Sequence, residues 1–240
     1  MRIPEYLEKD RFLYAGFIQL FLRGTAQIIE EAPDGFFVKD TRSGVYMFAA
    51  DNGAAAERII SKHKDEPCRI AVAADAYSAD ALQKFYGFTK RVPVTQGVYE
   101  KDEPPHVTAP GLTIRPAREE DVAFVTEHYR LQAKGEIEEI TKTGELFIGV
   151  NEKGERVGFL GRHREGSMGL LVILPEFRRH GYAGAMESFL VDKTLKEGLI
   201  AYGHILIGND ASTTLQNGLG FTLKDDLLYW VYGAPEQSSD

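Results

Sequence analysis

The chain of 240 residues is 43% hydrophobic and 27% charged, a composition typical of globular proteins that excludes fibrous and wholly disordered classes. Its 36 acidic residues outnumber the 28 basic ones and give a formal net charge of −8. Proteins bind nucleic-acid phosphates through an excess of positive charge, so we expect no nucleic-acid partner. The apolar stretches are too short to span a bilayer and no signal-peptide pattern follows Met1, so we expect a cytoplasmic protein without a membrane partner.

The single cysteine, Cys68, precedes an apolar stretch. A lone thiol forms no internal disulfide and has no second thiol with which to share a metal ion. We therefore predict no metal site, and we expect Cys68 to be buried as a small apolar side chain.

The first part of the chain predicts alternating helices and strands. Apolar residues over 12–21 predict a leading helix that belongs to a core, and an apolar run from Val45 leads into a helix-forming stretch after Gly53. Residues 69–74 predict a strand, and a short helix is expected before Gly87.

A proline-rich segment then divides the chain. Residues 101–111 contain three prolines and several charged residues and have little to bury, which is typical of a linker. We predict one domain over residues 1–104, a linker over 105–110 and a second domain over 111–240. The second domain carries the larger share of the excess negative charge.

The second domain predicts a mixed α/β fold around one sheet, because strand-like apolar runs alternate with helical patterns. The expected strands cover residues 112–116, 145–150, 156–161, 168–174, 204–207 and 227–232. The expected helices begin after residue 118, and cover 136–143, 181–198 and 211–217.

The two domains share a repeat. Residues 81–89 align with residues 214–222 at an offset of 133, with Leu, Gln, Gly, Phe and Thr identical in register. At the same offset the predicted strand over 69–74 aligns with residues 202–207. We infer that the chain contains two copies of one fold.

The most informative motif follows the strand predicted over residues 168–174. After Pro175 the chain continues as Arg178-x-x-Gly181-x-Ala183, at the expected start of a helix. A helix start has unpaired backbone N–H groups and partial positive charge, so it suits a phosphate group. Arg178 can neutralise the negative charge of that phosphate. The stretch contains neither the Gly-Lys-Ser/Thr of a P-loop nor the Gly-x-Gly-x-x-Gly of a dinucleotide fingerprint.

These residues resemble the GNAT superfamily of N-acetyltransferases, whose acyl-CoA loop is Gln/Arg-x-x-Gly-x-Gly/Ala after a strand that ends in Val-x-Pro. The match runs from Ile173 to Ala183. The tail from Asn209 to Phe221, followed by Tyr229 and Trp230, resembles the glycine N-acyltransferase-like branch of that superfamily. The resemblance covers the C-terminal half and implies acetyl-CoA, or another acyl-CoA, as cosubstrate.

The resemblance also implies which residues bind acyl-CoA. Two groups are expected to do so, the strand before the loop with the loop itself, and the segment after the next strand. The first group comprises Leu171, Val172, Ile173, Arg178, Arg179, His180, Gly181, Tyr182, Ala183 and Gly184, and the second comprises Asn209 and Ser212. Backbone groups of Leu171 and Ile173 would pair with the pantetheine amides. Asn209 and Ser212 also fit a strand-end turn and a helix N-cap, and both interpretations stay open.

The usual catalytic residues of the family are missing. Many GNAT enzymes have a glutamate on the strand before the loop and a tyrosine on the helix before Gly-Phe, where this chain has Ser167-Met168-Gly169 and Leu215. The nearest candidates for proton transfer are His163 and Glu165, each of which also fits a solvated hairpin residue. Catalysis by positioning with a water-relayed base is a further option.

The first copy has no such loop. Its equivalent stretch passes from Val45 to Glu57 without an arginine pattern, so we expect a degenerate GNAT-like domain that binds no CoA. Its expected roles are to cover part of the second domain's sheet, to shape the acceptor pocket, or to mediate formation of a homodimer.

The sequence thus predicts an acyl-CoA-dependent N-acyltransferase that transfers an acyl group, in the first place acetyl, to a primary amine of a small molecule or an amino acid. Acidic charge favours a cationic amine, whereas the resemblance favours an amino acid. The alternative is a binding module that holds acyl-CoA as a sensor or scaffold without turnover. Transfer of an aminoacyl group from tRNA is a third option, against which the acidic charge and the intact loop argue.

Overall fold

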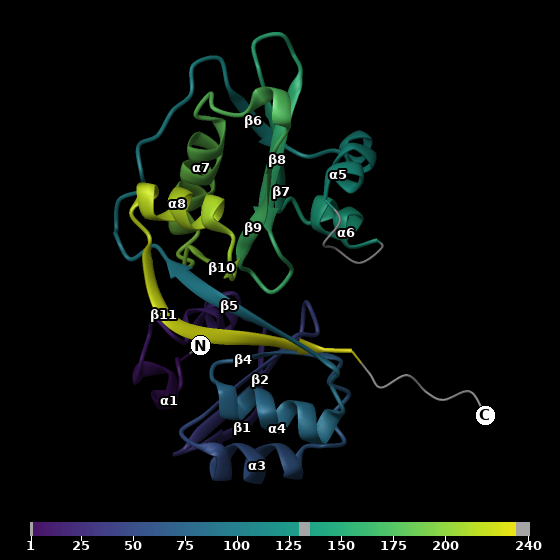
Figure 1. Ribbon diagram of the computed structural model, residues 1–240, viewed down its shortest axis with the longest axis vertical. Helices are drawn as coiled ribbons and strands as arrows, with labels where there is room; N and C mark the ends of the chain where they lie inside the picture. The colour runs from purple at the N-terminus through teal and green to yellow at the C-terminus, as the bar shows by residue number, and fades with distance from the viewer. Residues whose placement is uncertain (1, 130–134, 234–240) are drawn as a thin grey trace, which may run out of the picture. The chain divides into compact units, whose positions relative to one another are not determined.

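A computed structural model describes residues 2–129 and 135–233 of the protein (Figure 1). Contacts within the chain define two compact units. Unit 1 comprises Met1–Val98, His204–Asp210 and Leu223–Asp240, and unit 2 comprises Tyr99–Gly203 and Ala211–Thr222. Each unit therefore combines segments that lie far apart in the sequence, and the division predicted at residues 105–110 stays a prediction.

Unit 1 contains four α-helices, six strands and the end of a further strand, β10 (Tyr202–Leu206), among its described residues. The helices are α1 (Glu5–Glu8), α2 (Ala15–Leu22), α3 (Gly53–Lys62) and α4 (Ala76–Tyr86). The strands are β1 (Ala26–Ala32), β2 (Gly35–Asp40), β3 (Tyr46–Ala50), β4 (Ile70–Ala73), β5 (Lys90–Val98) and β11 (Thr222–Tyr232).

The sheet of unit 1 is apolar on both faces. Successive residues of a strand point to opposite sides, and β2 carries apolar residues in succession. Phe37 lies in the cluster beneath α3 and α4, together with Cys68, which is 8% exposed as expected. Its neighbour Phe36 points the other way, and its ring lies 6.3 Å from that of Tyr6 and 6.1 Å from that of Phe21. The covering helices thus bury both faces.

The leading helix is part of this core, as predicted. Phe17 and Leu20 of α2 are fully buried, and no helix among the described residues is long and apolar enough to cross a membrane. The helix begins at Ala15, so the expected start at residue 12 was wrong; Asp10 accepts hydrogen bonds from the backbone N–H groups of Phe12 and Leu13, which holds them in a turn before the helix.

The last strand of the chain belongs to unit 1. The strand order there is β1-β2-β3-β4-β11-β5, so β11 lies between two strands from the first hundred residues. It runs antiparallel to β4, with Tyr229 opposite Ala73 and Val231 opposite Ala71. The predicted strand started at residue 227, five residues too late, because the exposed charges of Lys224 to Asp226 interrupt the apolar pattern.

Unit 2 contains the remaining elements. Its helices are η1 (Glu119–Asp121), α5 (Val122–His128), α6 (Glu136–Lys142), η2 (Pro175–Phe177), α7 (Tyr182–Lys196) and α8 (Asp210–Leu219). Its strands are β6 (Thr113–Pro116), β7 (Leu146–Val150), β8 (Arg156–Arg162), β9 (Met168–Ile173) and the start of β10 (Tyr202–Leu206). Their order is β10-β9-β8-β7-β6, and β6 to β9 are antiparallel neighbours.

Helices cover both faces of these strands (Figure 1). Phe147 and Leu160 pack with α7, whereas their neighbours Ile148 and Phe159 pack with α5 and α6. The alternation of side chains along β7 and β8 therefore builds two cores, and the predicted mixed α/β fold is confirmed.

The repeat in the sequence is also a repeat of structure. At the offset of 133, β4, α4 and β5 align with β10, α8 and β11. Gly87 and Gly220 follow the two helices with φ angles of +70° and +86°, a left-handed conformation that glycine adopts without steric cost.

The predicted linker contains neither helix nor strand and lies along α7. Ser188 on α7 donates a hydrogen bond to the carbonyl of Pro105, and the N–H of Val107 donates to the Ser188 hydroxyl at 3.4 Å. This part of the segment is therefore anchored to unit 2.

The position of β11 predicts where a core substitution will act. Val231 is fully buried in the core of unit 1. Replacing it by Ala removes two methyl groups, and we expect the free energy of unfolding of unit 1 to fall by about 2 kcal/mol. Hydrogen exchange should accelerate in β3 and β4 more than in β7 to β9, with the exposed Asp225→Ala as control. Loosening confined to β7 to β9 would contradict the assignment.

Candidate functional site

The candidate site starts at an irregularity in β9. Phe159 of β8 lies opposite Val172, and Gly161 lies opposite Gly169, so β9 has one more residue than β8 between these pairs. The extra residue is a β-bulge at Leu170 and Leu171, and Leu170 has a φ of +56°. A bulge leaves backbone groups outside the ladder, and a left-handed leucine is a strained conformation that points to a functional role.

On the side away from β8, the first residue of β9 pairs with β10. Met168 pairs with Gly203 in a parallel arrangement. A Cβ atom on Gly203 would lie 3.0 Å from the Met168 carbonyl oxygen, so the close approach of the two strands suits glycine.

The loop after β9 turns sharply into α7. The helical turn η2 follows directly, Arg178 donates from Nε to the Ile173 carbonyl at 3.2 Å, and Arg179 has a φ of +67°. His180 contacts the carbonyl of Arg178 through Nδ1 at 2.8 Å, and its ring stacks on that of Tyr182 at 5.7 Å. These contacts fix the loop while the guanidinium of Arg179 stays exposed.

The first turn of α7 is open. Gly181 is its N-cap with a φ of +77°, and no side chain among the described residues caps it. The N–H groups of this turn are therefore available for an anion, and the fifteen-residue helix adds partial positive charge. Gly184 is less open, because a Cβ there would lie 3.3 Å from Val107 and 4.0 Å from Leu215.

Most of the expected acyl-CoA residues lie between the end of β9 and the start of α7, in unit 2. The residues from Leu171 to Ile173 end β9, those from Arg178 to Gly181 form the loop, and Tyr182 to Gly184 start α7. Ser212 lies in the first turn of α8 in the same unit, whereas Asn209 belongs to unit 1 and donates from its backbone N–H to the Leu206 carbonyl at 3.0 Å.

The two proton-transfer candidates lie in the hairpin before β9. A Cβ on Gly169 would stand 2.5 Å from His163 Nε2, so the imidazole covers the backbone directly before the bulge. Glu165 is 5% exposed and accepts a hydrogen bond from the Ser167 hydroxyl. The interpretation of Glu165 as a solvated hairpin residue was therefore wrong, because the hairpin folds its carboxylate inward.

Tyr129 lies near this carboxylate and was not expected from the sequence. Burial, and then the charges of Glu136 and Glu165, raise the pKa of Tyr129 to about 12. Its ring also lies 6.3 Å from that of Phe159. Tyr129 directly follows α5 and is separated from Glu165 by 36 sequence positions, so no local pattern pairs them.

The corresponding strands of unit 1 are closed. β3 and β4 pair along their length, from Tyr46 opposite Ala71 to Phe48 opposite Ala73, and the N–H of Ala74 donates to the Phe48 carbonyl at 2.9 Å. In unit 2 the parallel neighbours β9 and β10 pair instead at Met168 and Gly203, at the start of β9.

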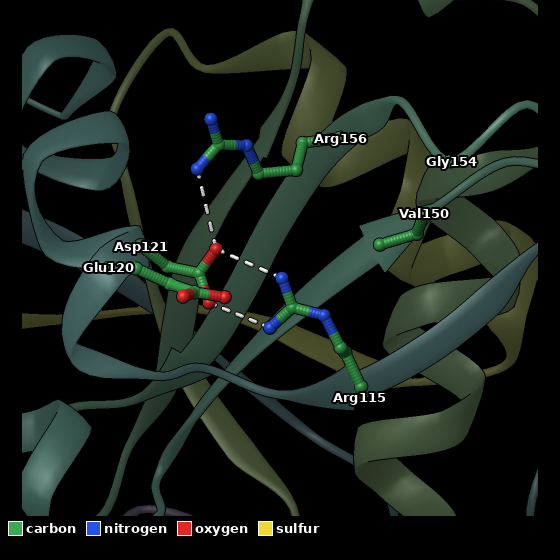
Figure 2. Close-up of a pocket in the computed structure, with 6 residues that line it drawn as sticks. All are labelled: Arg115, Glu120, Asp121, Val150, Gly154 and Arg156. Atoms are coloured by element: carbon green, nitrogen blue, oxygen red, sulfur yellow. Dashed lines mark hydrogen bonds and ion pairs between the residues drawn. The ribbon is translucent and has the colours of Figure 1, made fainter.

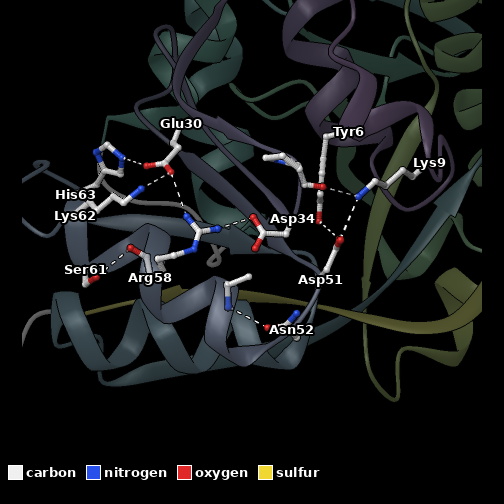
Figure 3. Close-up of polar contacts among 12 residues, drawn as sticks. Tyr6, Lys9, Glu30, Asp34, Asp51, Asn52, Arg58, Ser61, Lys62 and His63 are labelled. Atoms are coloured by element: carbon white, nitrogen blue, oxygen red, sulfur yellow. Dashed lines mark hydrogen bonds and ion pairs between the residues drawn. The ribbon is translucent and has the colours of Figure 1, made fainter.

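The helix start in unit 1 is closed as well (Figure 3). The Asn52 side chain accepts from the N–H of Ala55 at 3.0 Å and so caps the first turn of α3. The neighbouring Asp51 accepts from Tyr6 at 3.0 Å and from Lys9 at 3.2 Å. An anion at this helix start would have to displace Asn52 beside a carboxylate.

A separate cavity of about 450 Å³ in unit 2 contains an ion cluster (Figure 2). Asp121 is 1% exposed, binds Arg115 through two bonds of 2.6 and 3.0 Å, and lies 3.4 Å from Arg156. Burial favours its neutral form, but the bonds from Arg115, from the Arg118 N–H and from Arg156 outweigh this and lower the pKa of Asp121. Because one carboxylate occupies both guanidinium groups, we interpret the cluster as a structural link between β6, β8 and η1.

Comparison with known proteins identifies the fold. Residues 147–231 match the family described as FR47-like protein. A Drosophila protein of known structure superimposes with a TM-score of 0.65 at 15% identity, over 83% of this chain and 74% of that chain. A GCN5-related N-acetyltransferase from Kribbella flavida gives 0.55 at 14% identity over 95% of both chains.

An acetyltransferase of the GNAT family from Colwellia psychrerythraea gives a TM-score of 0.53 at 12% identity, over 97% of this chain and 98% of that chain. No curated protein matches the sequence. The protein therefore has the GNAT fold.

The ion cluster predicts a pH-dependent contribution to stability. Replacing Asp121 by Asn keeps the shape and removes the charge, so we expect the free energy of unfolding to fall by about 2 kcal/mol at pH 7. A carboxylate whose folded pKa is lowered stabilises the fold above its ordinary pKa of about 3.9, and this contribution disappears as the pH falls through the folded value. The difference between wild type and variant in urea unfolding should therefore shrink on acidification.

The exposed neighbour Glu120 supplies the control for this measurement. Glu120→Gln should change the unfolding free energy little at either pH, since its carboxylate is 68% exposed. An equal loss for Asp121→Asn at neutral and acidic pH would show that shape, and not charge, is what Asp121 supplies.

Proposed function

We propose that the protein is an acyl-CoA-dependent N-acyltransferase that transfers acetyl from acetyl-CoA to a primary amine. The observation that carries the proposal is a bulged strand, β9, which runs through an arginine-containing loop into an uncapped helix start. The GNAT fold supports it, because two of the structural neighbours are described as acetyltransferases, one GCN5-related and one of the GNAT family.

The loop suits the pyrophosphate of CoA. The open first turn of α7 offers backbone N–H groups, and Gly181 leaves its side of the turn free of any Cβ contact. Arg178 is exposed and held by its Nε bond to the Ile173 carbonyl, and Arg179 adds a second exposed cation. Charge-assisted hydrogen bonds of this kind are the stronger class in proteins.

The bulge suits the pantetheine arm and the thioester. Backbone groups of Leu171 and Ile173 would pair with the pantetheine amides, and an N–H at the bulge would polarise the thioester carbonyl. A base first takes a proton from the acceptor's ammonium group. The neutral amine nitrogen then forms the new C–N bond and the C–S bond breaks, and the proton that the nitrogen loses is taken up by the CoA thiolate.

Glu165 is our candidate for the base, with His163 as the second. The carboxylate of Glu165 is buried and fixed by Ser167, and the imidazole of His163 covers Gly169 next to the bulge. The same buried negative charge favours an acceptor that arrives as an ammonium ion. A cationic small molecule fits this charge, and an amino acid fits the resemblance to the glycine N-acyltransferase-like branch; both stay candidates.

Unit 1 is proposed to bind no CoA. Two features support this. β3 and β4 pair with each other, and Asn52 accepts a hydrogen bond from an N–H group of the first turn of α3, so these backbone groups already have partners. We propose that it acts as a degenerate copy that shapes the acceptor side or mediates dimer formation.

A non-catalytic sensor of acyl-CoA is the second candidate. It is favoured by Leu215, which stands at the position of the family's tyrosine and packs towards Gly184 on α7. A leucine supplies no proton to the departing thiolate, so on this alternative the protein would hold acyl-CoA without transfer.

Loss of CoA affinity tests the loop. In the double variant Arg178→Ala with Gly181→Glu, one cation is lost and a carboxylate faces the pyrophosphate. We expect acetyl-CoA affinity to fall by about tenfold to a hundredfold or more, measured by calorimetry. Arg69→Ala, which removes an exposed arginine of unit 1, should bind as wild type does. Equal affinity in the double variant would refute the site.

An amine panel tests the reaction. Incubation with acetyl-CoA and pooled amino acids, polyamines, aminoglycosides or peptides should release free thiol with one pool above a Gly181→Glu control. Glu165→Gln should keep acetyl-CoA affinity and lower kcat by about 10²-fold or more. Tight binding without release from any pool would favour the sensor, and absence of binding would refute both functions.

A further inference from the structure

A buried carboxyl group lies in α7 outside the residues discussed so far. Glu187 stands in the second turn of the helix, 6% exposed, between Met186 and Leu190 of the apolar core. Transfer of a charged carboxylate into such surroundings is costly unless a cation or several hydrogen bonds compensate it. Its neighbours therefore decide which protonation state the site holds.

Gln216 of α8 is the polar group that faces Glu187. Its Nε2 donates to Glu187 Oε1 at 3.2 Å, and Gln216 itself is 7% exposed. Gln216 Oε1 is buried and has no hydrogen-bond partner among the described residues. A carboxylate can only accept, so a charged Glu187 would leave this oxygen unpaired.

A neutral carboxylic acid satisfies both side chains. One of its oxygens accepts from Gln216 Nε2, as observed, and its O–H is able to donate to Gln216 Oε1, which would close a two-bond acid–amide pair. Burial raises the pKa of Glu187, the hydrogen bond from Gln216 lowers it, and the resulting pKa is about 7. No charged group contributes to this shift. The two observations agree on the neutral form.

The pair lies over the junction of β9 and β10. A Cβ on Gly203 would stand 3.3 Å from Gln216 Nε2 and 3.0 Å from the Met168 carbonyl, so the amide covers the point where the strands meet. From β10 the group facing the amide is a glycine, without a titratable side chain, and from β9 it is a backbone carbonyl. The pair thus links α7 to α8 directly above this junction.

We propose that Glu187 is a neutral carboxylic acid in the folded protein and that its proton-dependent pair with Gln216 is a positioning device that fixes α8 on α7. Because α7 begins with the acyl-CoA loop, the pair also sets the loop against Ser212 of α8. This second consequence rests on the proposed function, whereas the protonation does not.

The proposal has a defined pH dependence. A carboxyl whose folded pKa lies above the ordinary value of about 4.3 makes the folded protein bind an additional proton between the two values, so stability falls as the pH rises through this range. Relative to Glu187→Gln, the unfolding equilibrium constant of wild type should rise by about tenfold per pH unit between about pH 5 and pH 7, and level off above it.

Glu187→Gln is the informative variant because a glutamine can both donate to and accept from Gln216 without a proton. We expect its unfolding to lack the additional pH dependence, and hydrogen exchange in α8 above pH 8 to be slower than in wild type. Asp192→Asn, which removes a more exposed carboxylate of the same helix, should follow wild type. Gln83→Met, at the matching position of unit 1, is a second control, since Gln83 bonds to the Phe88 carbonyl instead.

Infrared spectroscopy of the wild type needs no variant to fold. A carbonyl band of a protonated carboxylic acid should be present at pH 6 and disappear above pH 8. Absence of this band at pH 6, or parallel pH profiles for wild type and Glu187→Gln, would overturn the proposal.

Acetyl-CoA binding separates the two proposals. Wild-type affinity should weaken above pH 7 while Glu187→Gln keeps its affinity, and parallel profiles would overturn the effect on the loop. Failure of acetyl-CoA to bind either protein at any pH, with the infrared band and the stability profile as expected, would overturn the proposed function and leave the acid–amide pair intact.

Discussion

The left-handed backbone of Leu170 is the constraint on which unit 2 depends. A leucine in this conformation costs on the order of 1–2 kcal/mol, so the surrounding packing has to hold it. Its side chain is 2% exposed among Val125, Ile148 and Phe159, and on β8 a Cβ at Gly161 would lie 3.2 Å from it. The core on the α5 side thus stabilises the bulge at which we propose that acyl-CoA binds.

The two units share an order of strands and helices but differ at the end of the strand that leads into a helix. β3 and β9 both lead into a helix, and the difference lies in a few local bonds. In unit 1 the ladder continues to Ala74 and Asn52 caps α3, so the backbone groups at the carboxyl end of the strand are used internally. In unit 2 the parallel β9 and β10 pair at Met168 and Gly203, at the start of β9, and α7 has a glycine N-cap without a side-chain bond. Availability of backbone groups, more than the identity of side chains, distinguishes the candidate site from its copy.

Local patterns predicted the parts of the fold that depend on local physics. The period of apolar residues located β7, β8 and α7, and Pro175 with Gly181 marked the loop between strand and helix. Burial of Glu165 was missed because it depends on how a hairpin folds onto Tyr129, far away in the sequence. Glu187 and Gln216 were missed for the same reason: their contact exists only once α7 packs against α8. The pairing of β11 with β4 was equally hidden, since an amphipathic strand does not specify its neighbour.

The position of β11 also bears on how the chain folds during synthesis. A ribosome releases residues in order from the N-terminus, and domains generally fold in that order. Residues 1–98 emerge first, yet the strand between β4 and β5 is contributed by residues 222–232. Until these emerge, β4 lacks its antiparallel neighbour and presents an open apolar edge. Unit 1 thus begins folding early, but its sheet is completed only after residues 222–232 have emerged.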